Sequence, residues 1–208
     1  MTVPTVEVAA GLTPAATFLA DPDVTDDVAR MYLADVRGQG YVAHLTRLWA
    51  HSPAAMTAMA QVLALVADEA GLTFRQCALV VSACASTMSD SYCSLAWGSK
   101  LSATAGDVTA AQVLAGDDSA LPHEERLLTA WARRMARDPN STTGAHVAEL
   151  RAAGFDDRQI FAVTVFVALR LAFSTVNDTL GAAPDAELAD RVPPRVRSAV
   201  TFGRQPSP

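Results

Sequence analysis

The sequence has few charged residues: they make up 18% of its 208 positions, below the usual share of about a quarter. Acidic residues outnumber basic ones, and the formal net charge is −6. An acidic chain with scattered basic residues repels phosphate backbones, so no nucleic-acid partner is expected. Half of the residues are hydrophobic, which is enough for a buried core. The weakly charged surface predicts that some helix faces meet another subunit.

Cysteine is scarce as well, and the three residues Cys77, Cys84 and Cys93 form no disulfide framework. The N-terminal residues have no basic stretch before an apolar one, so no signal peptide is predicted. The longest apolar stretch, residues 160–173, is interrupted by Arg170 and is too short to cross a bilayer. These absences predict a cytoplasmic protein with no membrane partner.

Metal-binding patterns are missing from the sequence. His44 and His51 are seven residues apart, and no two histidines have the i, i+4 spacing of a zinc-binding helix. There is no short cluster of cysteine and histidine, no glycine-rich phosphate loop and no nucleophile elbow. We therefore predict neither a metal nor another cofactor.

Helix signals dominate and strand signals are nearly absent, which predicts an all-α fold. Capping residues, prolines and glycines place helices at residues 25–37, 41–51, 53–70, 74–86, 90–105, 107 onward, 122–137, 143–153 and 157–180. The chain is divided into three predicted segments: an N-terminal arm (1–24), a single helical domain (25–185) and a C-terminal tail (186–208). A short helix and a frayed end are expected in the tail.

One cap-and-helix unit occurs twice in the chain. Residues 71–76 and 154–159 share the order glycine, apolar residue, helix cap, any residue, arginine, glutamine. The two arginines lie 83 positions apart, and each unit fits a capping box at the start of an apolar helix. The recurrence predicts two related helical halves, although chance reuse of a common capping pattern would give the same letters.

Several stretches carry a resemblance to a known family: His51-Ser-Pro53, Phe74 to Ser82, Tyr92-Cys93 with the helix to Ala105-Gly106, and Leu150 to Phe155 leading to Val176-Asn-Asp178. With them, residues 41–181 resemble the alkylhydroperoxidase D-like, carboxymuconolactone decarboxylase-like superfamily, especially its peroxidase-related branch. The resemblance covers about two-thirds of the chain. It implies an all-α, alkylhydroperoxidase D-like fold and assembly as a homo-oligomer, either a dimer, a trimer or a hexamer.

Active members of that superfamily carry a glutamate, then Cys-x-x-Cys at a helix start, then a histidine four residues after the second cysteine. Cys93 matches the second and more reactive cysteine. The first cysteine is replaced by Asp90, the histidine by Trp97, and the glutamate position falls at or near Ala78. The resemblance thus implies a degenerate site from which dithiol peroxidase activity is not expected.

Two opposing effects act on Cys93. It lies in the first turn of a predicted helix, where backbone N–H groups and the helix dipole lower the pKa of a thiol. Asp90, one turn earlier, puts an anion beside the nascent thiolate and raises that pKa. The sequence therefore allows either a reactive or an inert Cys93. Cys77 and Cys84 are about 10 Å apart on one helix face, too far to bridge, and Cys84 is expected in the core.

The same helix start is expected to line a small-molecule pocket. Besides Cys93, the predicted lining residues are Ser89, Asp90, Tyr92, Trp97 and Lys100. An acid, an indole and a thiol within two turns can bind a small organic molecule, with Asp90 and Cys93 as the catalytic candidates and Asp90 as a general base. The opposing interpretation is that Asp90 only caps the helix and that Trp97 fills and closes the pocket.

Three functions stay open on the sequence alone. The preferred one is a repurposed protein that binds a small organic molecule, or transforms it without a cofactor and without thiol redox turnover. The second is a one-cysteine thiol peroxidase or redox sensor that uses Cys93 with an external thiol. The third is a non-catalytic oligomeric binding protein in which Trp97 fills the old site.

Overall fold

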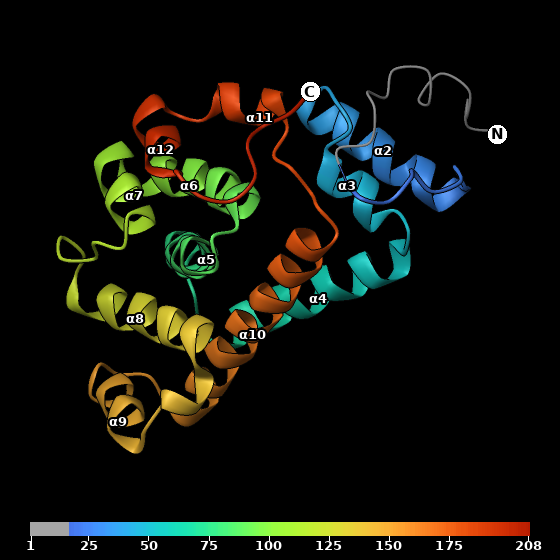
Figure 1. The fold of residues 1–208 in the computed structure, drawn as a ribbon. Coiled ribbons are helices and arrows are strands. Elements are labelled where there is room, and N and C mark those ends of the chain that lie inside the picture. The colour runs from blue at the N-terminus through green and yellow to red at the C-terminus, as the bar shows by residue number, and fades with distance from the viewer. Residues whose placement is uncertain (1–16) are drawn as a thin grey trace.

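The computed structural model describes residues 17–208, so most of the predicted N-terminal arm lies outside the described residues. The described chain is helical (Figure 1), and the predicted all-α fold is confirmed. The helices are α2 (Asp26–Gln39), α3 (His44–Trp49), α4 (Pro53–Glu69), α5 (Phe74–Met88), α6 (Ser91–Ala105), α7 (Asp107–Leu114), α8 (His123–Arg137), the 3₁₀ turn η1 (Pro139–Ser141), α9 (Gly144–Ala152), α10 (Asp157–Thr179), α11 (Ala186–Arg191) and α12 (Pro194–Ala199).

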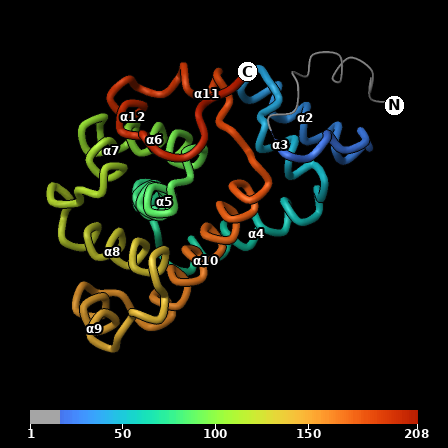
Figure 2. The backbone as a smooth tube through the Cα atoms, in the orientation of Figure 1, coloured from blue at the N-terminus to red at the C-terminus, as the bar shows by residue number. Residues whose placement is uncertain are grey.

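Helix α5 lies at the centre of the molecule. Figure 2 shows it along its axis, and it packs against α6, α7, α8 and α10. Every residue from 78 to 85 is buried. The sequence of this stretch is apolar or small on all sides, and a helix without a polar face is stable only when other elements surround it. Helix α6, which follows α5 after a tight turn, therefore starts in the protein interior.

The two cap-and-helix units have the same local geometry. Thr73 and Asp156 each form the predicted capping box, and these boxes open α5 and α10. Each unit begins with a glycine in the left-handed region, with φ of 66° and 102°. The second unit also contacts the residue just before the first, because the Gln159 amide donates to the carbonyl of Ala70 at 3.4 Å.

Some predicted helix ends are displaced. Helix α2 continues past Gly38 to Gln39, because Gly40 (φ 88°) supplies the left-handed residue that ends it. Helix α3 covers only His44–Trp49 instead of residues 41–51. Ser52 does precede α4 as predicted, but its side chain makes no capping hydrogen bond.

The chain after residue 185 is more ordered than the sequence predicted. It forms two short helices, α11 and α12, which pack on α6 and α7 at the top of Figure 1. Val192 and Val196 are buried in the core cluster that these helices share. The expected single short helix with a frayed end is therefore wrong. Leu188, Val192 and Val196 recur every four residues, and this apolar spacing gives the segment a face to bury.

Helix α10 is long and apolar enough to cross a membrane by length and composition. It is longer than the apolar stretch of residues 160–173, because the helix extends into polar residues at both ends. One face of it, including Phe166, Val167 and Phe173, is buried against the rest of the chain. Core helices of globular domains have the same composition, so this feature is accounted for by packing.

Candidate functional site

Asp90 fixes the start of α6. Ser89 ends α5 in the left-handed region (φ 62°), and Asp90 is the residue directly before α6. One oxygen of the Asp90 carboxylate accepts a hydrogen bond from the backbone N–H of Cys93 at 2.8 Å. The capping contact considered for Asp90 is therefore present. The second oxygen is buried and has no hydrogen-bond partner among residues 17–208, and the role of general base stays a prediction.

Cys93 is a buried thiol. Burial raises its pKa well above the ordinary value, the negative charge of Asp90 raises it further, and the charge of Arg170 opposes both. The guanidinium Nη2 of Arg170 lies 3.7 Å from Sγ, and the amide of Asn177 lies 3.9 Å from it. From the sequence, the helix dipole was expected to lower the pKa of Cys93 and Asp90 to raise it. The structure adds a larger effect, since desolvation of the sulfur favours the neutral thiol.

The other two cysteines do not form a bridge with Cys93. All three are free thiols. Cys84 is buried in the core as predicted, and burial raises its pKa to about 12. Burial also raises the pKa of Cys77, which is half-buried. None of the three thiols is therefore in an environment that favours a thiolate at neutral pH.

Trp97 and Lys100, on α6, form an aromatic and cationic cluster with residues of two other helices. The ammonium of Lys100 lies 4.2 Å from the centroid of the Trp97 ring, and the guanidinium of Arg170 lies 5.1 Å from it. Phe74, on α5, has its ring 6.3 Å from that of Trp97. Loss of water around the ammonium lowers the pKa of Lys100, and the charge of Arg170 lowers it further.

Trp97 is only half-buried, and it packs against all three core clusters that surround α6. One side of the indole is thus packed against the core, as expected if Trp97 fills the site. Its remaining surface, together with exposed Phe74 and Lys100, faces solvent. A small-molecule pocket at this helix start stays a prediction.

Tyr92 and Ser89 lie apart from this cluster. The Tyr92 hydroxyl donates to a carboxylate oxygen of buried Asp185 at 2.5 Å. The other oxygen of Asp185 accepts from the backbone N–H of His44 at 2.8 Å. Tyr92 thus ties α6 to the segment before α11. Ser89 is exposed at the end of α5. The structure therefore brings together four of the six predicted residues, Asp90, Cys93, Trp97 and Lys100.

The prediction from sequence missed Arg170 and Asn177, which α10 places beside Cys93. Asn177 is fully buried, and its side-chain oxygen accepts from the indole N–H of Trp49 at 2.9 Å. Arg170 was noted only as an interruption of an apolar stretch. A charge inside an otherwise apolar core helix is itself a signal, because such a charge needs compensation. We call Asp90, Cys93, Trp97, Lys100 and Arg170 the Cys93 site.

Two of the solved structures that resemble this fold are crystal structures of bacterial proteins. The alkylhydroperoxidase AhpD core of a peroxidase-related protein from Ralstonia eutropha JMP134 matches with a TM-score of 0.74 at 22% identity, covering 85% of this chain and 96% of that one. A peroxidase-related protein from Silicibacter sp. TM1040 matches with a TM-score of 0.73 at 21% identity, covering 86% and 97%. No protein-family model and no curated protein matches the sequence.

The chain has the alkylhydroperoxidase D-like helical fold, as the resemblance implied. At this identity the likeness establishes the fold and leaves the chemistry to the residues of this chain. Ala78, at the position where the resemblance implied a glutamate, is fully buried among apolar residues of α5, α6, α7 and α12. Its methyl group supplies no acid or base there.

Proposed function

We propose that the Cys93 site binds a small organic molecule without thiol redox turnover, and that any transformation there uses acid–base chemistry rather than sulfur chemistry. One observation carries this proposal: Cys93 is a buried thiol whose pKa is raised, with a carboxylate where a second thiol would be needed. A dithiol peroxidase needs a thiolate to attack the peroxide and a second sulfur to close the disulfide. In this chain Cys93 is held as a neutral thiol, and Asp90 stands where the second sulfur would be needed.

Hydroperoxide reduction tests this proposal. With cumene hydroperoxide as substrate and dithiothreitol as electron donor, we expect the wild-type protein to turn over no faster than the Cys93→Ser variant. The reason is that a neutral, buried thiol contributes no nucleophile. The rate is measured as loss of hydroperoxide. Turnover by the wild type that Cys93→Ser abolishes, with both proteins folded by circular dichroism, would overturn the proposal.

A one-cysteine thiol peroxidase or redox sensor is the second candidate function. It is favoured by the guanidinium of Arg170, which lies 3.7 Å from Sγ and would stabilise a thiolate. Burial and the charge of Asp90 act in the other direction and outweigh it. The hydroperoxide experiment separates the two functions, because only the second makes turnover dependent on Cys93.

We also propose that the chain assembles as a homo-oligomer through α4 and α10. These helices lie side by side, with Arg158 at the start of α10 paired to Glu69 at the end of α4. Each exposes large apolar side chains: Leu65 on α4 is 56% exposed and Phe161 on α10 is 70% exposed. Exposed apolar side chains on neighbouring helices are typical of surfaces that a subunit covers.

Substitutions on these helices are expected to break the assembly. Leu65→Glu places a charge that a covered apolar surface cannot accommodate, so the variant should shift toward the monomer. The mass in solution is measured by light scattering after size-exclusion chromatography. Val108→Glu on α7, where Val108 is 53% exposed, is the matched control and should leave the mass unchanged. A monomeric wild-type protein would contradict the proposal.

A further inference from the structure

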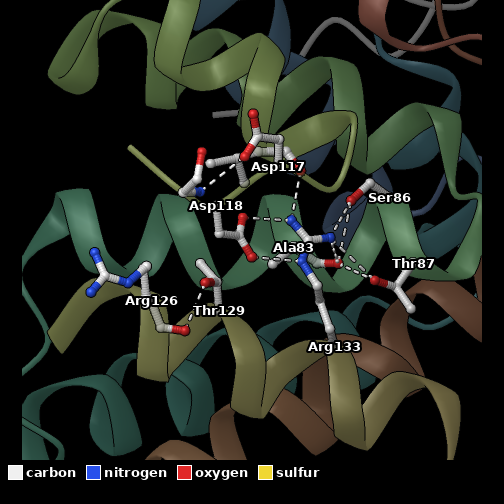
Figure 3. Close-up of polar contacts among 10 residues, drawn as sticks. Ala83, Ser86, Thr87, Asp117, Asp118, Arg126, Thr129 and Arg133 are labelled. Atoms are coloured by element: carbon white, nitrogen blue, oxygen red, sulfur yellow. Dashed lines mark hydrogen bonds and ion pairs between the residues drawn. The ribbon is translucent and has the colours of Figure 1, made fainter. Parts of the chain in front are cut away.

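Among residues 17–208, three arginines are buried, and two of them have a carboxylate partner. Arg47 donates from Nε and Nη2 to the two oxygens of Asp21, at 2.9 and 2.6 Å. Arg133 donates in the same way to Asp118, at 2.9 Å for both bonds. Figure 3 shows that Arg133 also reaches the hydroxyls of Ser86 and Thr87 and the carbonyl of Ala83. Both of these buried guanidinium groups are therefore neutralised by a carboxylate of the chain itself.

Arg170 is the exception. It is only 7% exposed, yet no carboxylate of residues 17–208 lies within 4.0 Å of its guanidinium. Its Nη2 contacts the sulfur of Cys93, and its Nε is buried without a partner among the described residues. A neutral thiol is a weak acceptor for a charged donor. Arg170 thus lacks the carboxylate contact that the other two buried arginines have, and a buried ion without such a contact is costly.

The surroundings of Arg170 add positive charge and aromatic surface. The guanidinium lies 5.1 Å from the Trp97 ring centroid and 5.0 Å from that of Phe173. Lys100 approaches the same Trp97 ring at 4.2 Å. Asp90 is the acidic member of the Cys93 site, and one of its oxygens is engaged by the backbone N–H of Cys93. The Cys93 site therefore contains two cationic side chains, Arg170 and Lys100, and one carboxylate, that of Asp90.

We propose that Arg170 and Lys100 bind the carboxylate of a small organic acid whose aromatic or apolar body lies against Trp97 and Phe74. A guanidinium offers parallel N–H donors that match a carboxylate, and a bound anion would supply the carboxylate contact that Arg170 lacks. Phe74 is exposed and its ring is 6.3 Å from Trp97, so these rings offer an apolar surface next to the cations. This inference rests on the proposed function, because it names the ligand class of the same site.

Two isosteric probes separate charge recognition from apolar binding: 2-naphthoate and its neutral amide, 2-naphthamide. Isothermal titration calorimetry on the full chain is expected to give at least about 10-fold tighter binding for 2-naphthoate, because only the acid carries the charge that Arg170 lacks. Arg170→Gln is expected to weaken 2-naphthoate binding by about 10-fold or more and to leave 2-naphthamide binding unchanged. Arg137→Gln, at an exposed arginine on α8, is the matched control and should leave both affinities unchanged.

A second variant keeps the test decisive if Arg170→Gln does not fold. Lys100 is exposed, so Lys100→Gln should fold as the wild type does and should weaken 2-naphthoate binding several-fold. The proposal is overturned if 2-naphthoate does not bind at millimolar concentration, if 2-naphthamide binds equally well, or if neither variant changes the affinity. Any of these results leaves the hydroperoxide test untouched. Conversely, Cys93-dependent turnover would overturn the proposed function without removing the carboxylate site.

Discussion

Arg133→Gln is expected to lower the free energy of unfolding by about 3 kcal/mol or more. Glutamine cannot replace the two parallel hydrogen bonds to Asp118, and it leaves the largely buried carboxylate without its counter-charge. It also removes the donor to the carbonyl of Val113, which Arg133 reaches at 2.6 Å. Urea unfolding followed by far-ultraviolet circular dichroism measures the loss.

The same substitution at Arg170 is expected to leave the free energy of unfolding unchanged or slightly higher. Removing a buried charge that has no carboxylate partner also removes its desolvation cost. Arg151→Gln, at an exposed ion pair with Asp157, is the surface control and should change little. Equal losses at Arg133 and Arg170 would contradict the distinction between a structural arginine and a ligand-binding one.

The positions of most helices could be predicted because their signals are local. The capping boxes at Thr73 and Asp156 and the glycine at position 106 act through neighbours a few residues away, so the sequence alone specifies them. The end of α2 was placed too early, at residue 37, because two glycines follow closely and either can end a helix. Only the backbone conformation shows that Gly40 takes the left-handed position.

The contents of the site were harder to predict because they depend on distant parts of the chain. Arg170 and Cys93 are 77 positions apart in the sequence. Tyr92 and its hydrogen-bond partner Asp185 are 93 positions apart. No periodicity within α6 shows that Tyr92 points toward α11 while Trp97 points toward α10. The role of Arg170 could have been suspected from a charge in an apolar core helix, but its lack of a carboxylate partner is visible only in three dimensions.

The burial of Cys93 decides the direction of its pKa shift, and the sequence alone did not predict how deeply this residue is buried. A helix start can be exposed or buried. The helix dipole lowers the pKa of a thiol in either case, but burial adds a desolvation cost that raises it, and for Cys93 the net shift is upward. Because α5 is the central helix, the turn after it starts α6 inside the protein. Tertiary packing therefore decides between the reactive and the inert form of this cysteine.

Alkylation of Cys93 in the folded protein is expected to be at least about 100-fold slower than that of free cysteine at pH 7.5. The thiolate is the reactive species, and its fraction falls tenfold for each unit by which the pKa rises. Asp90→Asn should accelerate the reaction, because the amide oxygen still caps α6 while the negative charge beside the sulfur is gone. Iodoacetamide labelling, with each cysteine followed by peptide mass spectrometry, gives the rates.

The dependence of the Cys93 alkylation rate on pH tests the central claim most directly. If Cys93 is a buried neutral thiol, its rate should keep rising through pH 9 and show no plateau while the protein stays folded. A plateau with a midpoint at or below about 8.5, the value of a free cysteine, would contradict the claim. Such a midpoint would mean that Cys93 is available as a nucleophile, and the non-redox interpretation of the site would fail.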